Sequence, residues 1–543
     1  MKLISPLKTE MKFSQMFLDF CEEKEFFNDR FPMNKSIFSS SNTLEKISYG
    51  NVKRTKFIEV IEKSFGNLSL SKKQRENLEI LTEPNSLNII TGQQVGFLGG
   101  PIYSVLKLQT AVSMADILNK KHNALAFVPI FWVEDNDHDN FEASFIHIFN
   151  EKYEPVSLSC SIENDKNDLR TVSSRVFDKD IISIIKTIKE ILPALIYKQD
   201  LCKIIEEIYQ PGKNWSDAFI EFLQIIFAES GILFCKSSEL RKAGLFRDII
   251  RMELENPGKS KLLIDKSNDL IQNRGYHIQA KSRQLNLFYI NNDKRHKIEA
   301  LNNQTNTLII DKKQYSQKEL LTIFDNEPSS FSPNVMLRPL CQDSIFPTAA
   351  YIGGPAEIAY LTQLKEVYNF FGILQPARIS RISATFIDKK TINILNDEGL
   401  EADFFFINLQ ELQSKLKSIM LTDLDSNTFD SAFVAIEAAF QKINEYVLDI
   451  DKNLENSVTG EKTKILKRME FLRNKVARHR KKSNLDKFDR LLMASNLIFP
   501  KNTLQERFYS PLNFINSMGL DAFKNMMAQQ SVSFPMEHRI LEL

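Results

Sequence analysis

The sequence lacks the features that mark several large classes of protein. Its five cysteines stand far apart, at positions 21, 160, 202, 235 and 341. No two of them have the short spacing of a zinc site or a redox pair, and a disulfide framework is not expected in a chain of 543 residues. The longest apolar run, 124–133, is far short of the roughly 20 residues that span a bilayer, and the N-terminal segment lacks the apolar core of a secretory signal. We therefore expect a soluble, cytoplasmic protein without a membrane partner.

An excess of charge of one sign is also absent. The 70 Lys and Arg residues balance 69 Asp and Glu residues, which leaves a formal net charge of +1. Proteins that bind nucleic acid use a basic surface to displace counterions, so we expect no nucleic-acid partner. Hydrophobic residues make up 43% of the chain and charged residues 26%, a composition that excludes disorder over the whole length. At roughly 100–200 residues per domain, the length predicts two to four structural units.

Short apolar segments alternate with helical patterns through the first two-thirds of the chain. The segments 87–90, 124–133, 231–235 and 335–340 are predicted strands, and 102–118 is a predicted helix. The second of these strands is apolar throughout, which is typical of a parallel sheet covered on both faces. Strands separated by helices predict an open α/β sheet.

Two long polar segments interrupt this pattern and are too long for ordinary loops. We interpret them as insertions into the α/β core, at about 151–230 and 256–330, and expect an antiparallel strand near 280–290.

A different periodicity follows residue 380. Apolar residues step by three and four along the heptad positions Phe433, Ile436, Phe440, Ile443, Val447, Ile450 and Leu454. The seam resumes at Ile465 after a break near Thr459–Gly460, so we expect a helical hairpin with a coiled-coil seam, or else core-facing helices of a bundle. We place the domain boundary at about residue 378, with a core of 1–378 and a coiled-coil domain of 379–543. The basic stretch 473–482 is interpreted as a solvated face or as a local anion site.

A glycine-rich turn follows the first strand. The segment 91–101 reads TGQQVGFLGGP and contains Gly92, Gly96, Gly99 and Gly100. A turn of this kind between a strand and a helix lets backbone N–H groups approach a phosphate or a carboxylate, although the turn can also be no more than a tight connection. The amides of Gln93 and Gln94 stand at the carboxyl end of the strand, where open α/β sheets bind ligands.

An acidic loop follows the second strand. Its sequence, Glu134 to Asp139, contains four carboxylates and one imidazole. A calcium loop fails because Asn140 stands where glycine is needed and Ile146 where a bidentate glutamate is needed. A catalytic metal at His138 lacks a second nearby histidine. The interpretation we favour is that the carboxylates bind an ammonium group or sugar hydroxyls while His138 acts as an acid/base or a phosphate donor; a solvated acidic loop is the other reading.

A third candidate segment spans 331–360. Arg338 is placed inside a predicted apolar strand, where an unpaired guanidinium is costly to bury, so it should meet a structural or ligand carboxylate. Gly353, Gly354 and Pro355 repeat the earlier Gly-Gly-Pro tripeptide before a predicted helix. Glu357 in that helix can complement the helix dipole. The segment Leu504–Arg507 adds Gln, Glu and Arg and is a weaker candidate for closing a site or an interface.

These motifs together resemble the bacillithiol biosynthesis cysteine-adding enzymes, the BshC family. The resemblance rests on TGQQVGFLGGPIY at 91–103, VPIFWVEDNDHD at 128–139, FSPNVMLRPLCQD at 331–343, YIGGPAEIAY at 351–360 and LQER at 504–507. It implies a Rossmann-like core with insertions, a C-terminal coiled coil through which homodimers form, and the last step of bacillithiol synthesis. That step joins the carboxyl group of cysteine to the amine of glucosaminyl-malate. Two positions depart from the family pattern, Asn136 and Gly99, where an acid and a threonine are common.

The resemblance and the motifs lead to a set of expected site residues. We expect Asp137, His138 and Asp139 to be catalytic, and the glycines 92, 96, 99, 100, 353 and 354 to bind phosphate. Substrate contacts are expected from Thr91, Gln93, Gln94, Tyr103, Asp135, Arg338 and Glu357. ATP is the expected co-substrate, because an amide forms from a carboxylate only after hydroxide is replaced by a better leaving group. No metal is expected beyond Mg²⁺ carried by the nucleotide.

Two other functions fit the same residues. One is a nucleotide-dependent ligase or nucleotidyltransferase that acts on another acid–amine pair. The other is a coiled-coil scaffold with a vestigial core, against which the acid-rich loops at the strand ends argue.

Overall fold

The computed structural model describes residues 4–7, 10–38, 44, 47, 51–161, 168–301, 307–407, 411, 414, 427–534 and 536–543. The chain forms two compact units: Met1–Lys389 together with Thr503–Leu543, and Lys390–Asn502. The predicted division at residue 378 assigned the whole C-terminal part to the coiled coil, whereas Thr503–Leu543 packs with the first unit.

A five-stranded parallel sheet forms the centre of the first unit. Its order is β14–β13–β2–β3–β6, with β2 at Ser86–Gln94, β3 at Ala126–Glu134, β6 at Leu233–Lys236, β13 at Thr348–Gly353 and β14 at Ala377–Ser380. Seven consecutive residues of β3 are buried, as expected for a strand that helices cover on both faces. The prediction of a Rossmann-like α/β core is confirmed.

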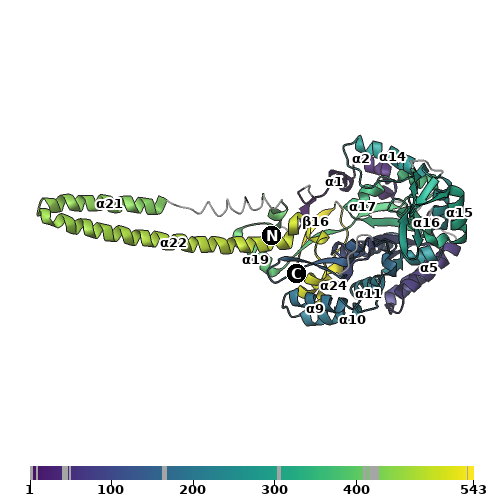
Figure 1. Ribbon diagram of the computed structural model, residues 1–543, viewed down its shortest axis with the longest axis horizontal. Coiled ribbons are helices and arrows are strands. Elements are labelled where there is room, and N and C mark those ends of the chain that lie inside the picture. The colour runs from purple at the N-terminus through teal and green to yellow at the C-terminus, as the bar shows by residue number, and fades with distance from the viewer. Residues whose placement is uncertain are drawn as a thin grey trace. The chain divides into compact units, whose positions relative to one another are not determined.

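Helices pack along this sheet and connect its strands (Figure 1). They include α5 (Asn51–Phe65), α6 (Lys72–Thr82), α7 (Tyr103–Lys121), α12 (Ser237–Lys242), α13 (Arg247–Glu255) and α17 (Pro355–Leu361). Helix α7 connects β2 to β3 and contacts both, as the helix predicted at 102–118 requires. Every residue from Ser104 to Ala115 is buried in α7, so this helix has no solvent face along most of its length.

The two polar insertions are folded rather than loop-like. The first contains α9 (Ile181–Ile191), α10 (Lys198–Ile208) and α11 (Trp215–Phe227). The second contains α14 (Lys259–Gln272), β7 (Leu287–Asn291), β8 (Lys294–Lys297), β9 (Glu299–Ala300), β10 (Thr307–Ile310), β11 (Lys313–Ser316) and α15 (Gln317–Asn326). Strand β7 pairs antiparallel with β8 and with β12 (Phe331–Pro333). The expected antiparallel strand therefore exists, but it begins at Leu287.

The strand predicted at 335–340 is wrong. This segment leads into the helix α16 (Arg338–Ile345), whose first turn contains Pro339. The side chain of Asn334 accepts hydrogen bonds from the backbone N–H groups of Met336 (2.9 Å) and Leu337 (3.3 Å), which fixes the turn before the helix. Proline in the first turn is a helix-start signal, and an asparagine side chain that accepts from nearby backbone N–H groups favours a turn. These local signals outweigh the apolar character of the run. The fourth strand is instead β13.

The C-terminal segment completes a second sheet of the first unit. Strand β16 (Glu537–Glu542) lies between β1 (Ile4–Pro6) and β15 (Ser383–Ile387), antiparallel to the former and parallel to the latter. Helices α23 (Leu512–Met518) and α24 (Leu520–Ala528) precede it. This pairing explains why the last part of the chain belongs to the α/β unit.

The second unit contains a long helical hairpin, in which α21 (Asn427–Leu448) and α22 (Glu455–Ile498) run side by side (Figure 1). The coiled-coil prediction is confirmed, but the turn is not at Thr459–Gly460: it lies at 449–454, and Gly460 is inside α22. No described side chain between 428 and 490 is buried, and Ile443, Ile450 and Leu472 on the predicted seam are exposed. The side chains of 479–485, which include much of the basic stretch, lie outside the described residues.

None of the helices in the described part of the chain combines the length and the apolar character that crossing a membrane requires.

Candidate functional site

A cavity of about 500 Å³ lies at the carboxyl ends of β2, β3 and β13. The end of β2 contributes Gly92, Gln93 and Gln94, the end of β3 contributes Glu134, and Gly354 follows β13. This is the edge at which open α/β sheets bind ligands. The lining contains seven Lys and Arg residues and four Asp and Glu residues, so the cavity favours anions.

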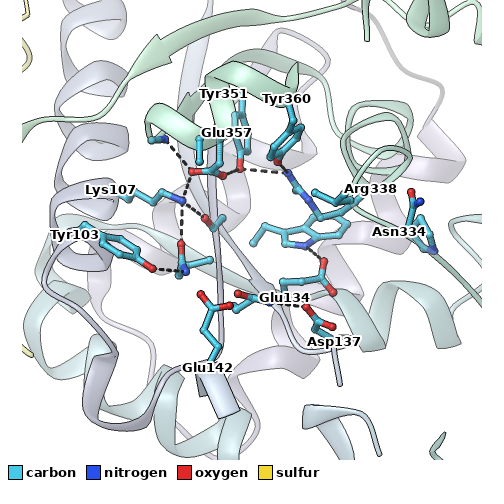
Figure 2. Close-up of a pocket in the computed structure, with 18 of the residues that line it drawn as sticks. Tyr103, Lys107, Glu134, Asp137, Glu142, Asn334, Arg338, Tyr351, Glu357 and Tyr360 are labelled. Carbon is cyan, nitrogen blue, oxygen red and sulfur yellow. Dashed lines mark hydrogen bonds and ion pairs between the residues drawn. The ribbon is translucent and has the colours of Figure 1, made fainter. Parts of the chain in front are cut away.

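The first group in the cavity is centred on Lys107 of α7 (Figure 2). Its ammonium donates to the carbonyl of Gly92 (2.8 Å) and to the Gln93 side chain (3.0 Å), and it forms an ion pair with Glu357. Only 3% of the Lys107 side chain is exposed. Burial lowers the pKa of Lys107, which the Glu357 carboxylate opposes. Lys107 thus connects the end of β2, through its hydrogen bonds, to the start of α17, through its ion pair.

Glu357 has two further partners. It accepts hydrogen bonds from the backbone N–H of Gly354 (2.8 Å) and from the Tyr351 hydroxyl (2.5 Å). Burial works against its charged form, but Lys107 and these donors outweigh burial and hold the pKa of Glu357 below its ordinary value. The expected role of Glu357 as a simple helix-dipole partner is therefore incomplete, since its carboxylate is a hub of the cavity wall.

The second group joins the acidic loop to the second insertion. Asp137 accepts from Arg295 (3.0 Å) and from the backbone N–H of His138 (2.7 Å) through one oxygen, and from Gln94 through the other. Burial would raise the pKa of Asp137, but the His138 contacts and the Arg295 charge outweigh it and lower that pKa. The guanidinium of Arg295 also stacks 3.8 Å from the ring of Phe288. Asp137 thus positions Gln94 and Arg295 at the cavity wall.

His138 contacts Asp137 and Phe288 at the cavity wall. Its side chain is 24% exposed, and its Nδ1 atom lies 3.3 Å from Asp137 Oδ1 without forming a hydrogen bond to any described residue. The ring also packs edge-on against Phe288, with centroids 5.7 Å apart. Because His138 lines the cavity, its imidazole can donate a proton to a bound ligand or accept one from it.

The third group surrounds Arg338, at the start of α16. Its guanidinium donates to the hydroxyls of Tyr360 (3.0 Å) and Tyr351 (3.3 Å) and to the side chain of Gln342 (3.1 Å). Figure 2 shows it facing Tyr360 beside Glu134. All three acceptors are neutral, so the expected carboxylate partner is not among the hydrogen-bond partners of Arg338 in the described part of the protein.

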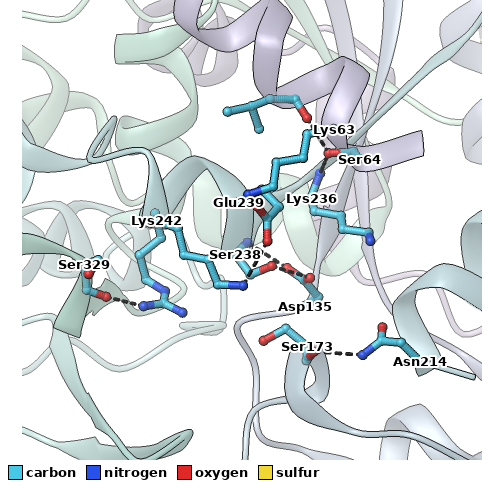
Figure 3. Close-up of polar contacts among 12 residues, drawn as sticks. Lys63, Ser64, Asp135, Ser173, Asn214, Lys236, Ser238, Glu239, Lys242 and Ser329 are labelled. Carbon is cyan, nitrogen blue, oxygen red and sulfur yellow. Dashed lines mark hydrogen bonds and ion pairs between the residues drawn. The ribbon is translucent and has the colours of Figure 1, made fainter. Parts of the chain in front are cut away.

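Glu134 and Asp135 are adjacent in sequence but have different surroundings. Glu134 lines the cavity, accepts from Trp132 (2.9 Å) and Ser237 (2.9 Å), and has its pKa raised by burial. Asp135 is 1% exposed and does not line the cavity. It accepts from the backbone N–H (2.8 Å) and the hydroxyl (2.6 Å) of Ser238 at the start of α12, where Figure 3 shows it. Asp135 therefore anchors α12 to β3 and does not face a substrate in the cavity.

Most glycines of the first turn have packing reasons to be glycine. A Cβ on Gly99 would lie 2.8 Å from the Phe222 ring, and its φ is +83°. A Cβ on Gly96 would lie 2.8 Å from the Cα of Gly100. Of the six glycines expected to bind phosphate, only Gly92 and Gly354 line the cavity. Close packing accounts for Gly96 and Gly99, a φ of +64° accounts for Gly100, and Gly353 is the last residue of β13.

The segment 504–507 reaches the same region from the C-terminal part of the unit. Glu506 is fully buried and accepts from Arg381 (2.6 Å), Ser383 (3.0 Å) and the backbone N–H of Ala384 (2.8 Å). Arg381 and Arg507 line the cavity. Burial would raise the pKa of Glu506, but the charge of Arg381 outweighs it and lowers that pKa. This segment therefore completes the wall of the site.

Among the described residues, no group of three or more His, Cys, Asp or Glu side chains is arranged to hold a metal ion.

Comparison with known proteins identifies the family. The model of the bacillithiol biosynthesis BshC N-terminal Rossmann-like domain matches residues 2–382, and that of the BshC C-terminal coiled-coil domain matches residues 384–543. The chain belongs to the BshC family. It is 29% identical over 509 residues to a protein of Salinibacter ruber, covering 93% of this chain and 92% of the relative, and 29% identical over 560 residues to one of Chlorobium phaeobacteroides, covering 98% and 97%. Both relatives carry the name "Putative cysteine ligase BshC".

The BshC site contains most of the expected residues and several that the sequence did not indicate. Expected residues in the cavity wall are Gly92, Gln93, Gln94, Tyr103, Asp137, His138, Arg338, Gly354 and Glu357. Thr91 lies outside it and donates to the carbonyl of Ile352 (3.0 Å), and Asp139 is exposed and caps a short helix by accepting from Glu142 N–H (3.0 Å). Missed residues include Lys107, Glu142, Lys281, Arg283, Arg295, Asn334, Tyr351, Tyr360 and Arg381.

Proposed function

We propose that this BshC chain is a cysteine ligase that joins the carboxyl group of cysteine to the amine of glucosaminyl-malate, the last step of bacillithiol synthesis. The observation that carries the proposal is the cavity at the ends of β2, β3 and β13, in which cationic side chains outnumber carboxylates and to which His138 contributes an imidazole. Family membership supplies the substrate class, since the relatives are named cysteine ligases.

ATP is the proposed co-substrate. A free carboxylate needs a better leaving group than hydroxide, and ATP supplies one as an acyl phosphate or as an adenylate. The cationic lining supports this choice, because preformed positive charge stabilises the transferring phosphate and the developing oxyanion. Mg²⁺ is proposed to arrive with the nucleotide.

The geometry assigns different roles to the residues of the acidic loop. His138 is proposed to donate a proton to the leaving group or to accept one from the attacking amine, because its ring lines the cavity and its Nδ1 atom has no hydrogen-bond partner among the described residues. Asp137 is engaged by Arg295 and Gln94, so we assign it to positioning rather than to the ammonium group of cysteine. Glu142, which also lines the cavity, is the acceptor we propose for that ammonium group.

The test combines purified protein with cysteine, glucosaminyl-malate and ATP, and detects bacillithiol by mass. Product is expected with cysteine and not with serine or alanine. Equal product from serine would favour a ligase acting on another acid–amine pair, and absence of product would contradict the proposal. Exchange of pyrophosphate into ATP in the presence of cysteine indicates the adenylate, whereas release of ADP without exchange indicates the acyl phosphate.

We further propose that the protein is a homodimer joined through the helical hairpin. The apolar seam residues Ile443, Ile450 and Leu472 remain exposed in the single chain, with exposed fractions of 47%, 64% and 47%. Light scattering after size exclusion should give twice the chain mass, and Ile443→Asp should halve it. A monomeric mass for the unsubstituted protein would refute this proposal. We assign the protein to the cytoplasm, the compartment that supplies ATP and reduced cysteine.

A further inference from the structure

The cations of the cavity fall into two classes. Lys107, Arg295 and Arg381 each form an ion pair with a described carboxylate. Arg338, Arg283, Lys281 and Arg507 line the same cavity and form no ion pair with any carboxylate in the described part of the chain. Arg338 and Arg283 are half-buried, and a cation taken partly out of water without a charged partner is costly to the folded protein, whereas Lys281 and Arg507 are exposed. The members of the second class are therefore the groups available to a ligand.

Arg338 has surroundings suited to one small anion. Its three hydrogen-bond acceptors are neutral, and its guanidinium lies 5.5 Å from the ring centre of Tyr351 and 5.9 Å from that of Trp132. Glu134 acts on Arg338 from the same wall, which limits how much further negative charge this place can take. A planar guanidinium with free N–H groups fits a carboxylate.

Arg283 and Lys281 form a different environment, on the second insertion. The Nη1 atom of Arg283 is buried and has no partner among the described residues. Arg283 and Arg295 both lie over the ring of Phe288, at 5.5 Å and 3.8 Å. The acid next to them, Asp137, is already bound by Arg295. Arg283 and the exposed Lys281, two residues apart in sequence, both line the cavity without an ion-pair partner among the described residues, which suits a ligand with several negative charges.

A buried network fixes Arg283. The side chain of Asn286 accepts from the backbone N–H of Arg283 (3.0 Å) and donates to its carbonyl (3.3 Å). Asn286 is itself held by Glu253 of α13, which is fully buried and accepts from the Asn286 backbone N–H (2.9 Å) and side chain (3.2 Å). The backbone of Arg283 is thus anchored to α13.

The same network reaches Arg338. Asn334 donates through its side chain (2.9 Å) and through its backbone N–H (2.9 Å) to the side-chain and backbone oxygens of Asn286, respectively. The carbonyl of Asn334 in turn accepts from the backbone N–H of Arg338 (2.9 Å). Asn286 therefore joins the two unpaired arginines through one continuous set of hydrogen bonds.

We propose that the cavity contains two anion subsites of different charge: Arg338 with Tyr351 and Tyr360 binds a single carboxylate group, and Arg283 with Lys281 binds an oligophosphate chain. Asn286 sets their separation. This inference rests on the proposed function, in which the malyl group supplies the carboxylate and the nucleotide supplies the phosphates. It places the phosphates on the second insertion and not on the glycine-rich turn.

The test measures equilibrium binding of two probes, malate and inorganic triphosphate, to the full chain by calorimetry. Arg283→Gln should weaken triphosphate binding at least tenfold and leave malate binding within twofold, because it removes a charge-assisted contact to the phosphates and none to the carboxylate. Arg338→Gln should have the reverse effect. Lys318→Gln, which removes an exposed charge of the same insertion outside the cavity, should change neither affinity by more than twofold.

Two outcomes would overturn the inference: equal losses for both probes in both arginine variants, or unchanged triphosphate binding in Arg283→Gln. Far-ultraviolet circular dichroism checks the fold of each variant, and Arg338→Lys and Arg283→Lys replace any variant that does not fold. The Lys substitutions keep the positive charge but remove the paired N–H donors of the guanidinium. Malate binding should therefore still weaken in Arg338→Lys, whereas triphosphate binding should weaken less in Arg283→Lys than in Arg283→Gln. The binding assay contains no cysteine and is independent of the assay for bacillithiol formation. If the two probes bind at separate subsites but no bacillithiol forms, the proposed function alone is contradicted. If bacillithiol forms but the subsites are not separate, this inference alone is contradicted.

Discussion

Fully buried ion pairs occur in the α/β unit and not among the described residues of the hairpin unit. In the α/β unit, the pairs Arg378–Asp343 and Arg381–Glu506 have side chains that are at most 3% exposed. In the hairpin unit, the pair Arg473–Asp430 is 46% and 56% exposed. A buried pair depends on the geometry around it, whereas an exposed pair is screened by solvent. The buried pairs of the first unit therefore depend on the packing around them, whereas the exposed Arg473–Asp430 pair contributes little to stability.

Breaking a buried pair should have the largest effect. Asp343→Asn leaves Arg378, which is fully buried, without a charged partner, and weakens the hydrogen bonds from Arg378 (3.1 Å) and Tyr368 (2.6 Å). We expect the free energy of unfolding to fall by about 3–5 kcal/mol. Both tryptophans, Trp132 and Trp215, lie in this unit, so urea unfolding followed by tryptophan fluorescence reports on it. A fall of less than about 1 kcal/mol in the free energy of unfolding would mean that this buried pair contributes no more than an exposed one.

Removing the Lys107 charge should affect activity more than any substitution in the hairpin. Lys107→Met keeps a similar volume but frees Glu357, Gln93 and the carbonyl of Gly92. We expect kcat/KM for amide formation to fall about 100-fold, the effect of misplacing reacting groups by about an ångström. Lys524→Met, on α24 outside the cavity, is the matched control and should retain activity. Activity within threefold of the unsubstituted enzyme would show that the ion pair does not position the site.

Acid should destabilise the first unit through Asp168. Hydrogen bonds from Arg170 lower the pKa of Asp168 to about 2, from an ordinary value of 3.8. Because the folded-state pKa is the lower one, the contribution to stability is complete above pH 3.8 and is lost as the pH falls towards 2. We expect about 1–2 kcal/mol, reduced by the 53% exposure of Arg170. In Asp168→Asn, the free energy of unfolding should depend less on pH between these two values. The same pH dependence in the variant and the unsubstituted protein would contradict the role of Asp168.

The elements that the sequence predicted correctly are those with a local periodic pattern. The apolar strand β3, the helix α7 and the heptad seam follow from periodicity, which local sequence carries. The strand expected at 335–340 failed because a short apolar run fits either a strand or a helix, although Pro339 was an available signal. The hairpin turn was assigned to Gly460, yet an exposed glycine costs a helix only about 1 kcal/mol. The Asp and Asn residues at 449–453 were the better signal, and Asp451 accepts from the backbone N–H of Asn453 (2.8 Å).

The site shows a second limit of sequence reasoning. The end of β3 was predicted to within one residue, whereas β2 continues through Thr91–Gln94, which the sequence assigned to the turn. The polar residues were still placed at the correct edge of the sheet because they follow apolar strands. Lys107 was missed because it stands between apolar residues of α7, where a single lysine usually marks a solvent face, and only the burial of that helix places it in the cavity. Arg283 and Arg295 were missed because they lie in a polar insertion, and no local pattern indicates which of its charges face inward.

The smallest effect is expected from the exposed pair of the hairpin. Asp430→Asn removes the partner of Arg473, whose nitrogen lies 3.3 Å from Asp430 Oδ1. We expect the free energy of unfolding to change by no more than about 0.5 kcal/mol, since an exposed pair gains little Coulomb energy and loses side-chain entropy. Thermal unfolding followed by helical circular dichroism reports on the hairpin. A loss comparable to that of Asp343→Asn would mean that this pair is buried in the working assembly, and such a loss should then depend on protein concentration, because a pair covered by a second chain is stabilised by association.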